Sequence, residues 1–189
     1  MTRIFLLLVI LGTGFSSIAQ DTTVVERGMR NPEAGMEYAR GPLLNSEQLE
    51  RKKWYYSVEE GNRDPENVYK ISLRDQDLEF FPLEVARFPN LQVLNLSANK
   101  IKVIPPDIEE LKNLQILILA DNKIKVLPPQ LGELENLTQL YLGGNKLVVV
   151  PAWVGGLAKL RKLDLTFNRL TQYEIDQLQS RLPRCEITH

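Results

Sequence analysis

The sequence repeats itself with a period of 23 residues, and this period constrains the fold more than any other feature. Segments that begin at Leu91, Leu114, Leu137 and Leu160 can be written under one another, and a weaker copy begins at Val68. The strong copies share the pattern LxxLxLxxNxLxxLPxxLxxLxx, with Ile and Val allowed for Leu. A repeat of this length is typical of proteins that stack one small structural unit many times.

These copies resemble the leucine-rich-repeat family, in particular its 23-residue LPxxL type, as in Ras-suppressor-like and Scribble-like repeats. The resemblance covers residues 68–170, and several copies in phase make it specific. The ends, with their Pro-Glu-Asn-Val lead-in at Pro65 and Leu-Pro-x-Cys ending at Leu182, are similar to small exported bacterial leucine-rich-repeat proteins. The resemblance implies an α/β solenoid, a right-handed superhelix of about five repeats with short parallel strands and helical caps at both ends.

Each copy begins with a short strand that ends in a polar turn. Leu91, Leu94 and Leu96 place apolar side chains on one face of the strand. An Asn then recurs at one position, and its amide can bond the backbone of neighbouring turns. We expect these side chains to form a buried structural ladder of Asn99, Asn122, Asn145 and Asn168. The first copy has Gln76 there, which predicts a looser turn at the edge of the stack.

The second half of each copy predicts a short helical return to the next strand. Ile101 and Ile104 re-enter the core, and Pro105-Pro106 opens the return. Asn recurs at the end of the returns, and this amino acid tolerates the left-handed conformation that stops a short helix. This explanation is proposed for Asn90, Asn113 and Asn136.

A stack of repeats exposes its core at both ends, so the flanking residues should cover it. We expect an N-terminal cap over residues 45–67, with capping pairs Asn45/Gln48 and Ser57/Glu60. Three aromatic residues in this cap either cover the first repeat or extend the binding surface: Trp54, Tyr55 and Tyr56.

Residues 171–189 are predicted to form the C-terminal cap. Thr171 and Glu174 indicate a capping box before a helix with Ile175, Leu178 and Leu182 on one face. Cys185 and Ile187 alternate with charged residues, which predicts a last strand in which Cys185 points inward. A catalytic thiol or an intermolecular disulfide are the alternatives for Cys185.

The first twenty residues have the pattern of a secretory signal peptide. Arg3 precedes an apolar run that ends before Gly12, and small residues lead to a cleavage site near Ala19 or Gln20. The run is shorter than the roughly 20 residues of a membrane span. We expect an exported protein, periplasmic or extracellular, with a signal peptide over residues 1–20, no membrane span in the mature chain, and a flexible linker over residues 21–44.

The composition argues against catalysis and against nucleic acid. The 189 residues include one Cys and one His, Cys185 and His189, so neither a zinc set nor a Ser/His/Asp arrangement is available. The formal net charge of −1 gives no attraction to phosphate backbones. We expect a monomeric, non-enzymatic module with no metal or cofactor that binds a protein or peptide; a surface structural, adhesive or carbohydrate-binding protein is the alternative.

The resemblance implies that the strands line a concave face and that the residues between the core positions point toward a partner. The residues predicted to bind it are Lys70, Ser72, Val93, Asn95, Ile116, Ile118, Gln139, Tyr141, Lys162 and Asp164 on the concave face, with Phe167 at its loop edge. Val93, Ile116, Ile118 and Tyr141 should form an exposed apolar centre, as partner sites often have. Gly143 and Gly144 predict a shallow dip beside Tyr141.

The predicted face is small. Five strands about 4.8 Å apart span about 19 Å, whereas a stable interface buries about 800 Å² per partner. The expected ligand is therefore an extended peptide, or a partner that also contacts Phe167 and the N-terminal aromatic residues.

Overall fold

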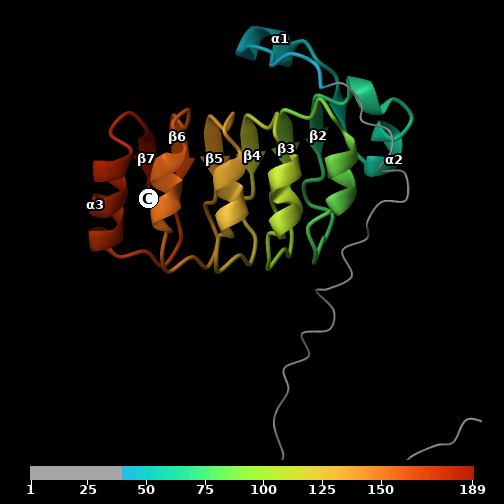
Figure 1. The fold of residues 1–189 in the computed structure, drawn as a ribbon. Coiled ribbons are helices and arrows are strands. Elements are labelled where there is room, and N and C mark those ends of the chain that lie inside the picture. Colours follow the sequence, from blue (N-terminus) through green and yellow to red (C-terminus); the bar gives the residue numbers. More distant parts are fainter. Residues whose placement is uncertain (1–39) are drawn as a thin grey trace, which may run out of the picture. The chain divides into compact units, whose positions relative to one another are not determined.

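The strands of the repeats pair side by side in chain order and form one parallel sheet (Figure 1). The computed structural model describes residues 40–189, and the predicted signal peptide lies outside the described residues. The strands are β1 (Trp54–Tyr55), β2 (Lys70–Ser72), β3 (Val93–Asn95), β4 (Ile116–Ile118), β5 (Gln139–Tyr141), β6 (Lys162–Asp164) and β7 (Glu186–Thr188). The helices are α1 (Ser46–Glu50), α2 (Val58–Gly61) and α3 (Gln172–Arg181), with the 3-10 helices η1 (Pro65–Asn67), η2 (Leu83–Arg87), η3 (Pro106–Glu110), η4 (Pro129–Glu133) and η5 (Ala152–Gly156).

The core is a set of stacked leucine columns, as the period predicts. Leu94 pairs with Leu117, and Leu140 pairs with Leu163, because equal repeat positions lie opposite one another in the register. All four side chains are fully buried. The α/β solenoid predicted from the sequence is therefore confirmed, with one strand from each cap added to the five strands of the repeats.

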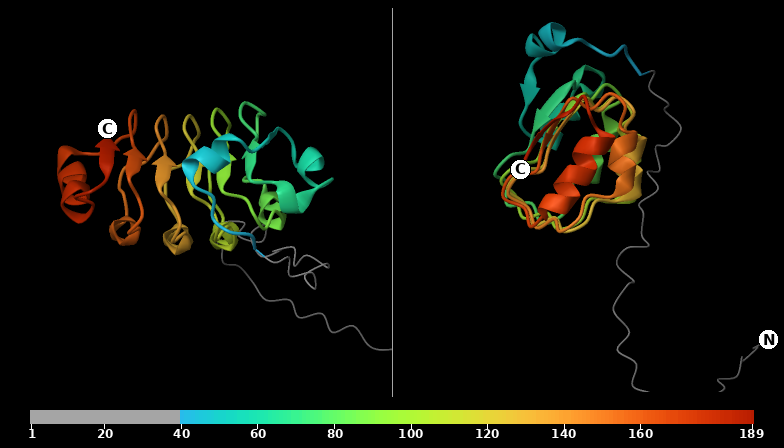
Figure 2. Two further views of the ribbon diagram at one scale, coloured as in Figure 1. Left: turned by 90° about the horizontal axis from the view of Figure 1, so that it is seen from above. Right: turned by 90° about the vertical axis from the view of Figure 1, so that its left-hand side faces the viewer.

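The returns form as five-residue 3-10 helices on the side of the coil away from the strands (Figure 2). A proline precedes each one as its N-cap, where the fixed φ of proline suits the start of a helical turn. Each return also buries one apolar side chain, Val85, Ile108, Leu131 or Val154 in turn.

The explanation proposed for the Asn residues after the returns is wrong. Asn90, Asn113 and Asn136 are not among the described residues with positive φ. Instead, each donates its side-chain Nδ2 to a backbone carbonyl of the preceding repeat, those of Glu66, Pro89 and Lys112 at 2.8, 3.1 and 2.8 Å. A side-chain hydrogen bond between repeats, rather than backbone conformation, accounts for their recurrence.

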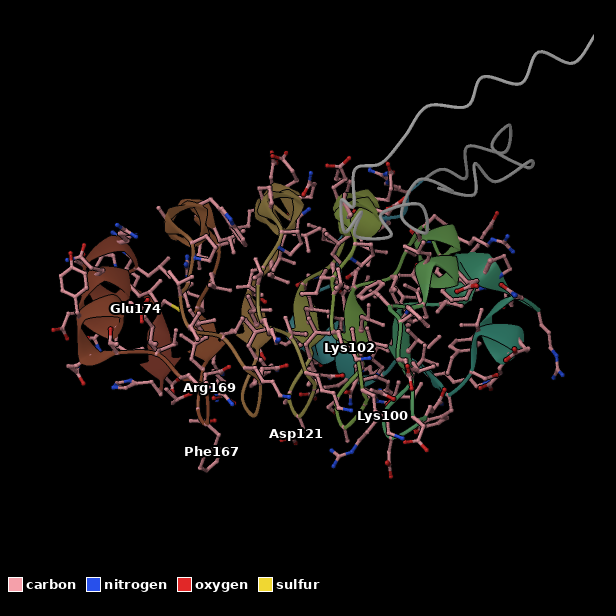
Figure 3. The ribbon with its side chains drawn as sticks, turned by 90° about the horizontal axis from the view of Figure 1, so that it is seen from below. Lys100, Lys102, Asp121, Phe167, Arg169 and Glu174 are labelled. Carbon is pink, nitrogen blue, oxygen red and sulfur yellow. The ribbon has the colours of Figure 1, made fainter. Side chains whose placement is uncertain are left out.

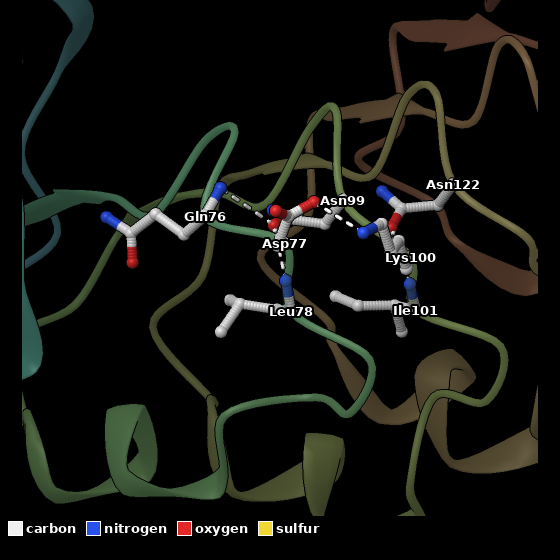
Figure 4. Close-up of polar contacts among 7 residues, drawn as sticks. All are labelled: Gln76, Asp77, Leu78, Asn99, Lys100, Ile101 and Asn122. Carbon is white, nitrogen blue, oxygen red and sulfur yellow. Dashed lines mark hydrogen bonds and ion pairs between the residues drawn. The ribbon is translucent and has the colours of Figure 1, made fainter.

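The Asn residues after the strands also link successive repeats (Figure 4). Asn122 donates Nδ2 to the carbonyls of Leu96 and Leu119, at 2.9 and 3.1 Å, and accepts the amide of Ile101 at 3.0 Å. Asn99 and Asn145 make the same pattern and are buried, whereas Asn168 at the end of the stack is half-buried. Because each amide serves its own turn and the one before, the ladder fixes the spacing of the repeats.

Gln76 occupies the ladder position in the first repeat, but it does not enter the ladder. Its side chain is directed to the cap, where Nε2 donates to the Tyr56 carbonyl at 2.9 Å. The backbone amides of Gln76 and Leu78 instead reach Oδ1 of Asn99. The first turn thus depends on the second repeat for its hydrogen bonds.

The N-terminal cap is built from α1, β1 and α2. Asn45 and Gln48 form the predicted capping box of α1, and β1 extends the sheet beside β2. Ser57 accepts the amide of Glu60 as predicted, but the Glu60 carboxylate accepts the amide of Tyr56 instead of that of Ser57.

The last residues of the predicted linker differ from the expectation. Gly41 donates to Asn90, and Leu44 donates to Oε1 of Gln92 at 2.9 Å. The side chains of Gln92 and Gln115 donate to the carbonyls of Pro42 and Leu44, at 3.1 and 2.8 Å. Residues 41–44 are therefore held along the edge where β3 and β4 begin.

The C-terminal cap agrees with the sequence pattern. Thr171 and Glu174 form the capping box of α3, and Ile175 and Leu178 are buried. Cys185 is half-buried and packs against the core just before β7. Within residues 40–189, no helix combines the length and the apolar character needed to cross a bilayer.

Candidate functional site

One end of the strand face is covered by the chain itself. Figures 1 and 2 place α1 over the strands, and Leu49 of α1 is buried. Lys70 and Val93, which pair in the register, are 5% and 4% exposed. The prediction that Lys70 and Val93 face solvent is therefore wrong, because a segment outside the repeats lies on this end of the face.

Lys70 is held beneath this segment by polar contacts. Its Nζ donates to the Glu50 carbonyl at 3.2 Å and lies 5.0 Å from the centre of the Trp54 ring. Burial lowers the pKa of Lys70, and the charge of Glu50 opposes that shift. Trp54 thus contacts the first repeat, as expected if it belongs to the cap that covers this repeat.

The remaining strand face is accessible, and we call it the open strand face: Ile116, Ile118, Gln139, Tyr141, Lys162 and Asp164. All six side chains are partly exposed, and the register brings them together as Ile118 beside Tyr141 and Gln139 beside Lys162. The hydroxyl of Tyr141 donates to Oε1 of Gln139 at 2.8 Å, and the Lys162 ammonium lies 5.7 Å from the Tyr141 ring centre. The result is a small apolar centre with an amide, a cation and a carboxylate at its end.

The predicted dip beside Tyr141 is filled. Gly143 is buried, and a Cβ at this position would lie 2.8 Å from Oγ1 of Thr166 and 3.1 Å from Oδ2 of Asp164. Asp164 itself accepts hydrogen bonds from the amide and hydroxyl of Thr166, at 3.0 and 2.8 Å. Gly143 is thus needed for close packing between repeats and makes no hollow for a ligand.

Two predicted binding residues of the first repeats lie beside the covered end. Ser72 and Asn95 pair in the register and are half-buried. Oδ1 of Asn95 accepts the amide and the hydroxyl of Ser97, at 3.0 and 2.7 Å. One Asn95 acceptor is thus occupied within its own turn, and the apolar centre lies further along the stack.

Phe167 stands at the loop edge of the same face, in an unusual conformation. Its side chain is 90% exposed, and its φ is 55°. The other repeats place Asp75, Ala98, Asp121 and Gly144 at this position, all with positive φ. The left-handed region favours Gly, Asn and Asp, and an aromatic residue there is uncommon. The glycine and the aspartates at this position were the sequence signal for the conformation.

Sequence reasoning missed Gln92 and Gln115, which hold the N-terminal segment. They share one repeat position, immediately before the strand, and Gln115 also donates to Gln92 at 2.8 Å. A polar residue that recurs directly after a buried leucine was the available signal. Among the described residues, no group of three or more His, Cys, Asp or Glu side chains could hold a metal ion.

The parallel strands, the 3-10 returns and the stacked Asn side chains define a repeat solenoid. The leucine rich repeat family model matches residues 66–124 and 112–170, which together cover more than half of the chain. The chain belongs to the leucine-rich repeat family. No curated protein sequence gives a significant match.

Solved structures of several leucine-rich-repeat proteins are similar. One is a protein of Leptospira interrogans, with TM-score 0.65 and 35% identity over 73% of this chain and 35% of that one. Internalin C2 of Listeria monocytogenes has TM-score 0.54 and 25% identity over 65% of this chain and 52% of its own. The ectodomain of the plant membrane receptor kinase GASSHO1/SCHENGEN3 of Arabidopsis thaliana, in complex with CASPARIAN STRIP INTEGRITY FACTOR 2, has TM-score 0.53 and 26% identity over 65% of this chain and 18% of its own. The chain thus spans about a third of the Leptospira protein.

Proposed function

We propose that this protein is an exported, non-catalytic module that binds an extended protein segment on the open strand face. The observation that carries the proposal is that the adjacent part of the same face already holds polypeptide. The segment from α1 to β1 lies there, and the carbonyl of Glu50 accepts the ammonium of Lys70. A partner segment would continue this arrangement along the stack, over Ile116, Ile118 and Tyr141.

The size of the free surface favours an extended segment. The strands β4 to β6 span only about 10 Å from first to last, too little for a globular partner that docks on this face alone. Ile116 and Ile118 offer apolar contacts, and Phe167 offers a large exposed ring at the loop edge. Aromatic anchors of this kind commonly contribute much of the binding energy.

A peptide fits better than a carbohydrate. A sugar ring would need the flat side of Tyr141 as a stacking platform. The ring of Tyr141 is half-buried, its hydroxyl is bonded to Gln139, and the Lys162 ammonium lies over it. Among the similar structures, the receptor kinase ectodomain of Arabidopsis was solved with CASPARIAN STRIP INTEGRITY FACTOR 2, which supports a protein ligand for this fold.

A crosslinking capture tests the binding site. Mature protein, the Ile118→Arg variant and a Leu83→Arg control would be incubated with envelope and culture fractions of the source cells, crosslinked and recovered. Leu83 is 42% exposed on a return, away from the strands. We expect Ile118→Arg to recover at least about tenfold less of a partner that the wild type and the control both recover. Equal recovery of this partner by Ile118→Arg, with an unchanged circular dichroism spectrum, would contradict the proposed site.

Export is tested separately, by the location and the N-terminus of the expressed protein. The apolar run after Arg3 supports cleavage near Ala19 or Gln20. We expect the protein from periplasmic or culture fractions to begin at Gln20 or Asp21 in mass spectrometry. An intact Met1 terminus in the cytoplasmic fraction alone would contradict export.

A further inference from the structure

A second surface lies on the underside of the coil in Figure 1, away from α1, where the chain runs from the Asn ladder to the returns. We call it the valine–lysine face: Val103, Val126, Lys102, Lys123, Lys125 and Lys146. Val103 and Val126 are 69% and 67% exposed, although the residues that follow them are buried. These six residues line an open groove of about 450 Å³.

The face carries one apolar column and two basic columns, and each recurs with the repeat. Val149 and Phe80 continue the column of Val103 and Val126 at either end, and both are exposed. The lysines follow two columns, and Figure 3 shows Lys100 and Lys102 of these columns on this side of the molecule. A solenoid aligns equal positions of successive repeats, so the chemistry of one position becomes a stripe.

The first repeat neutralises the beginning of this stripe with its own carboxylates. Asp77 lies 2.7 Å from Nζ of Lys100, and Glu79 lies 4.0 Å from Nζ of Lys102 (Figure 4 shows the first pair). The Lys100 ammonium lowers the pKa of Asp77 through its hydrogen bond and its charge. The chain thus presents carboxylates two residues apart to two lysine columns, with an exposed aromatic residue, Phe80, directly after them.

Further along, the columns continue without such carboxylates. Lys123, Lys125 and Lys146 are exposed, and none of them forms an ion pair within the described residues. We propose that the valine–lysine face binds an acidic peptide segment of a partner protein, with carboxylates at alternate positions and apolar residues between or beside them. This segment would place carboxylates on Lys123 and Lys125, as Asp77 and Glu79 are placed on Lys100 and Lys102, and an apolar residue on Val126.

Charge balance favours a peptide over a polyanion or a membrane. The formal net charge of the chain is −1, so long-range attraction to nucleic acid or to anionic lipid is weak. The valine–lysine face instead combines exposed lysines with exposed valines, which suits a ligand that is both acidic and apolar. The proposal is independent of the open strand face, because different residues carry it.

The probe for the test is a fluorescein-labelled peptide that repeats Asp-Leu-Glu-Phe, the sequence of residues 77–80. Fluorescence anisotropy would compare it with a neutral Asn-Leu-Gln-Phe peptide and an acidic Asp-Ser-Glu-Ser peptide. We expect the first peptide to bind, both controls to bind at least about tenfold more weakly, and added salt to weaken binding. Equal binding of the neutral peptide, or no binding of the first, would overturn the proposal.

Variants locate the binding. Lys123→Glu/Lys125→Glu should weaken binding at least about tenfold. Arg87→Glu/Lys112→Glu, with the same charge change at the end of η2 and just after η3, should not. Val126→Ser should also weaken binding. If the two pairs of charge changes weaken binding equally, the valine–lysine face is not the binding site. Tighter binding of phosphatidylserine vesicles, of a DNA duplex or of a second copy of the chain than of the peptide would also contradict it.

Discussion

Replacing Phe167 by Asn should stabilise the protein, because the backbone of residue 167 has a left-handed conformation that Asn tolerates better than Phe. A left-handed backbone costs an L-residue about 1–2 kcal/mol, and Asn is among the few residues enriched there. The ring contributes little in return. At 90% exposure it buries about a tenth of its surface, or about 20 Å², which corresponds to about 0.5 kcal/mol. We expect a net gain of about 0.5–1 kcal/mol in the free energy of unfolding.

Urea unfolding followed by circular dichroism measures this gain. With an m-value of about 2 kcal/mol/M, the unfolding midpoint should rise by about 0.3–0.5 M. The control is Asp121→Asn at the equivalent position, where φ is also 55° and the native residue already suits the conformation. Its stability should change by less than about 0.5 kcal/mol. A loss of stability in Phe167→Asn, or an equal gain in Asp121→Asn, would refute the reasoning.

The same variant bears on function. Backbone strain is retained mainly where a site requires it, so the variant that gains stability should lose affinity for a partner of the open strand face. A more stable Phe167→Asn protein that binds this partner as well as the wild type would assign Phe167 no role in the site.

Three further results are expected. Asn122→Ala should lower the free energy of unfolding by about 2–4 kcal/mol, because it leaves the buried backbone amide of Ile101 without its acceptor. Gln76→Ala, at the equivalent exposed position, should change this free energy by less than about 0.5 kcal/mol in the same urea titrations. The hydrogen bond from Lys53 lowers the pKa of Glu60 below its ordinary 4.5. The stability that ionised Glu60 contributes is therefore present above pH 4.5 and is lost as the pH falls through the pKa of the folded protein. Acid titrations of Glu60→Gln should lack this loss, and an acid profile identical to that of the wild type would contradict the prediction. Burial raises the pKa of the Cys185 thiol, so iodoacetamide at pH 8 should alkylate it more slowly in the folded protein than in urea, and equal rates would show an ordinary thiol.

The period predicted the parts of the fold that equal repeat positions determine. Strand, turn and return recur because each copy must bury the same leucines, so Leu94 and Leu117 could be paired from the sequence alone. The period could not predict the cover over Lys70 and Val93, because the covering segment lies outside the repeats and contacts them across about 20 to 70 residues of chain. Its signal was the glutamine that recurs at Gln92 and Gln115, whose side chains bond the backbone of residues 42–44.

A recurring residue led to a wrong prediction where the same residue type suits two structural roles. Asn after a return fits a left-handed helix end as well as a side-chain bond between repeats, and the sequence does not distinguish them. The structure assigns the second role to Asn113, through the carbonyl of Pro89. At Phe167, by contrast, the repeat position determines the backbone conformation, which all five repeats share, and only the aromatic side chain differs from the residues of the other repeats.

The two candidate surfaces differ in how they change along the stack, and this difference bears on their ligands. The central column of the strand face changes at every repeat, from Asn95 to Ile118, Tyr141 and Asp164. A surface whose chemistry changes every 4.8 Å or so can discriminate between sequences, because each position of a partner segment meets a different side chain. The valine–lysine face repeats nearly the same chemistry in successive turns, so neighbouring turns can accept the same motif. Under the two proposals, the valine–lysine face selects a type of sequence, acidic and apolar, and the strand face selects the individual partner.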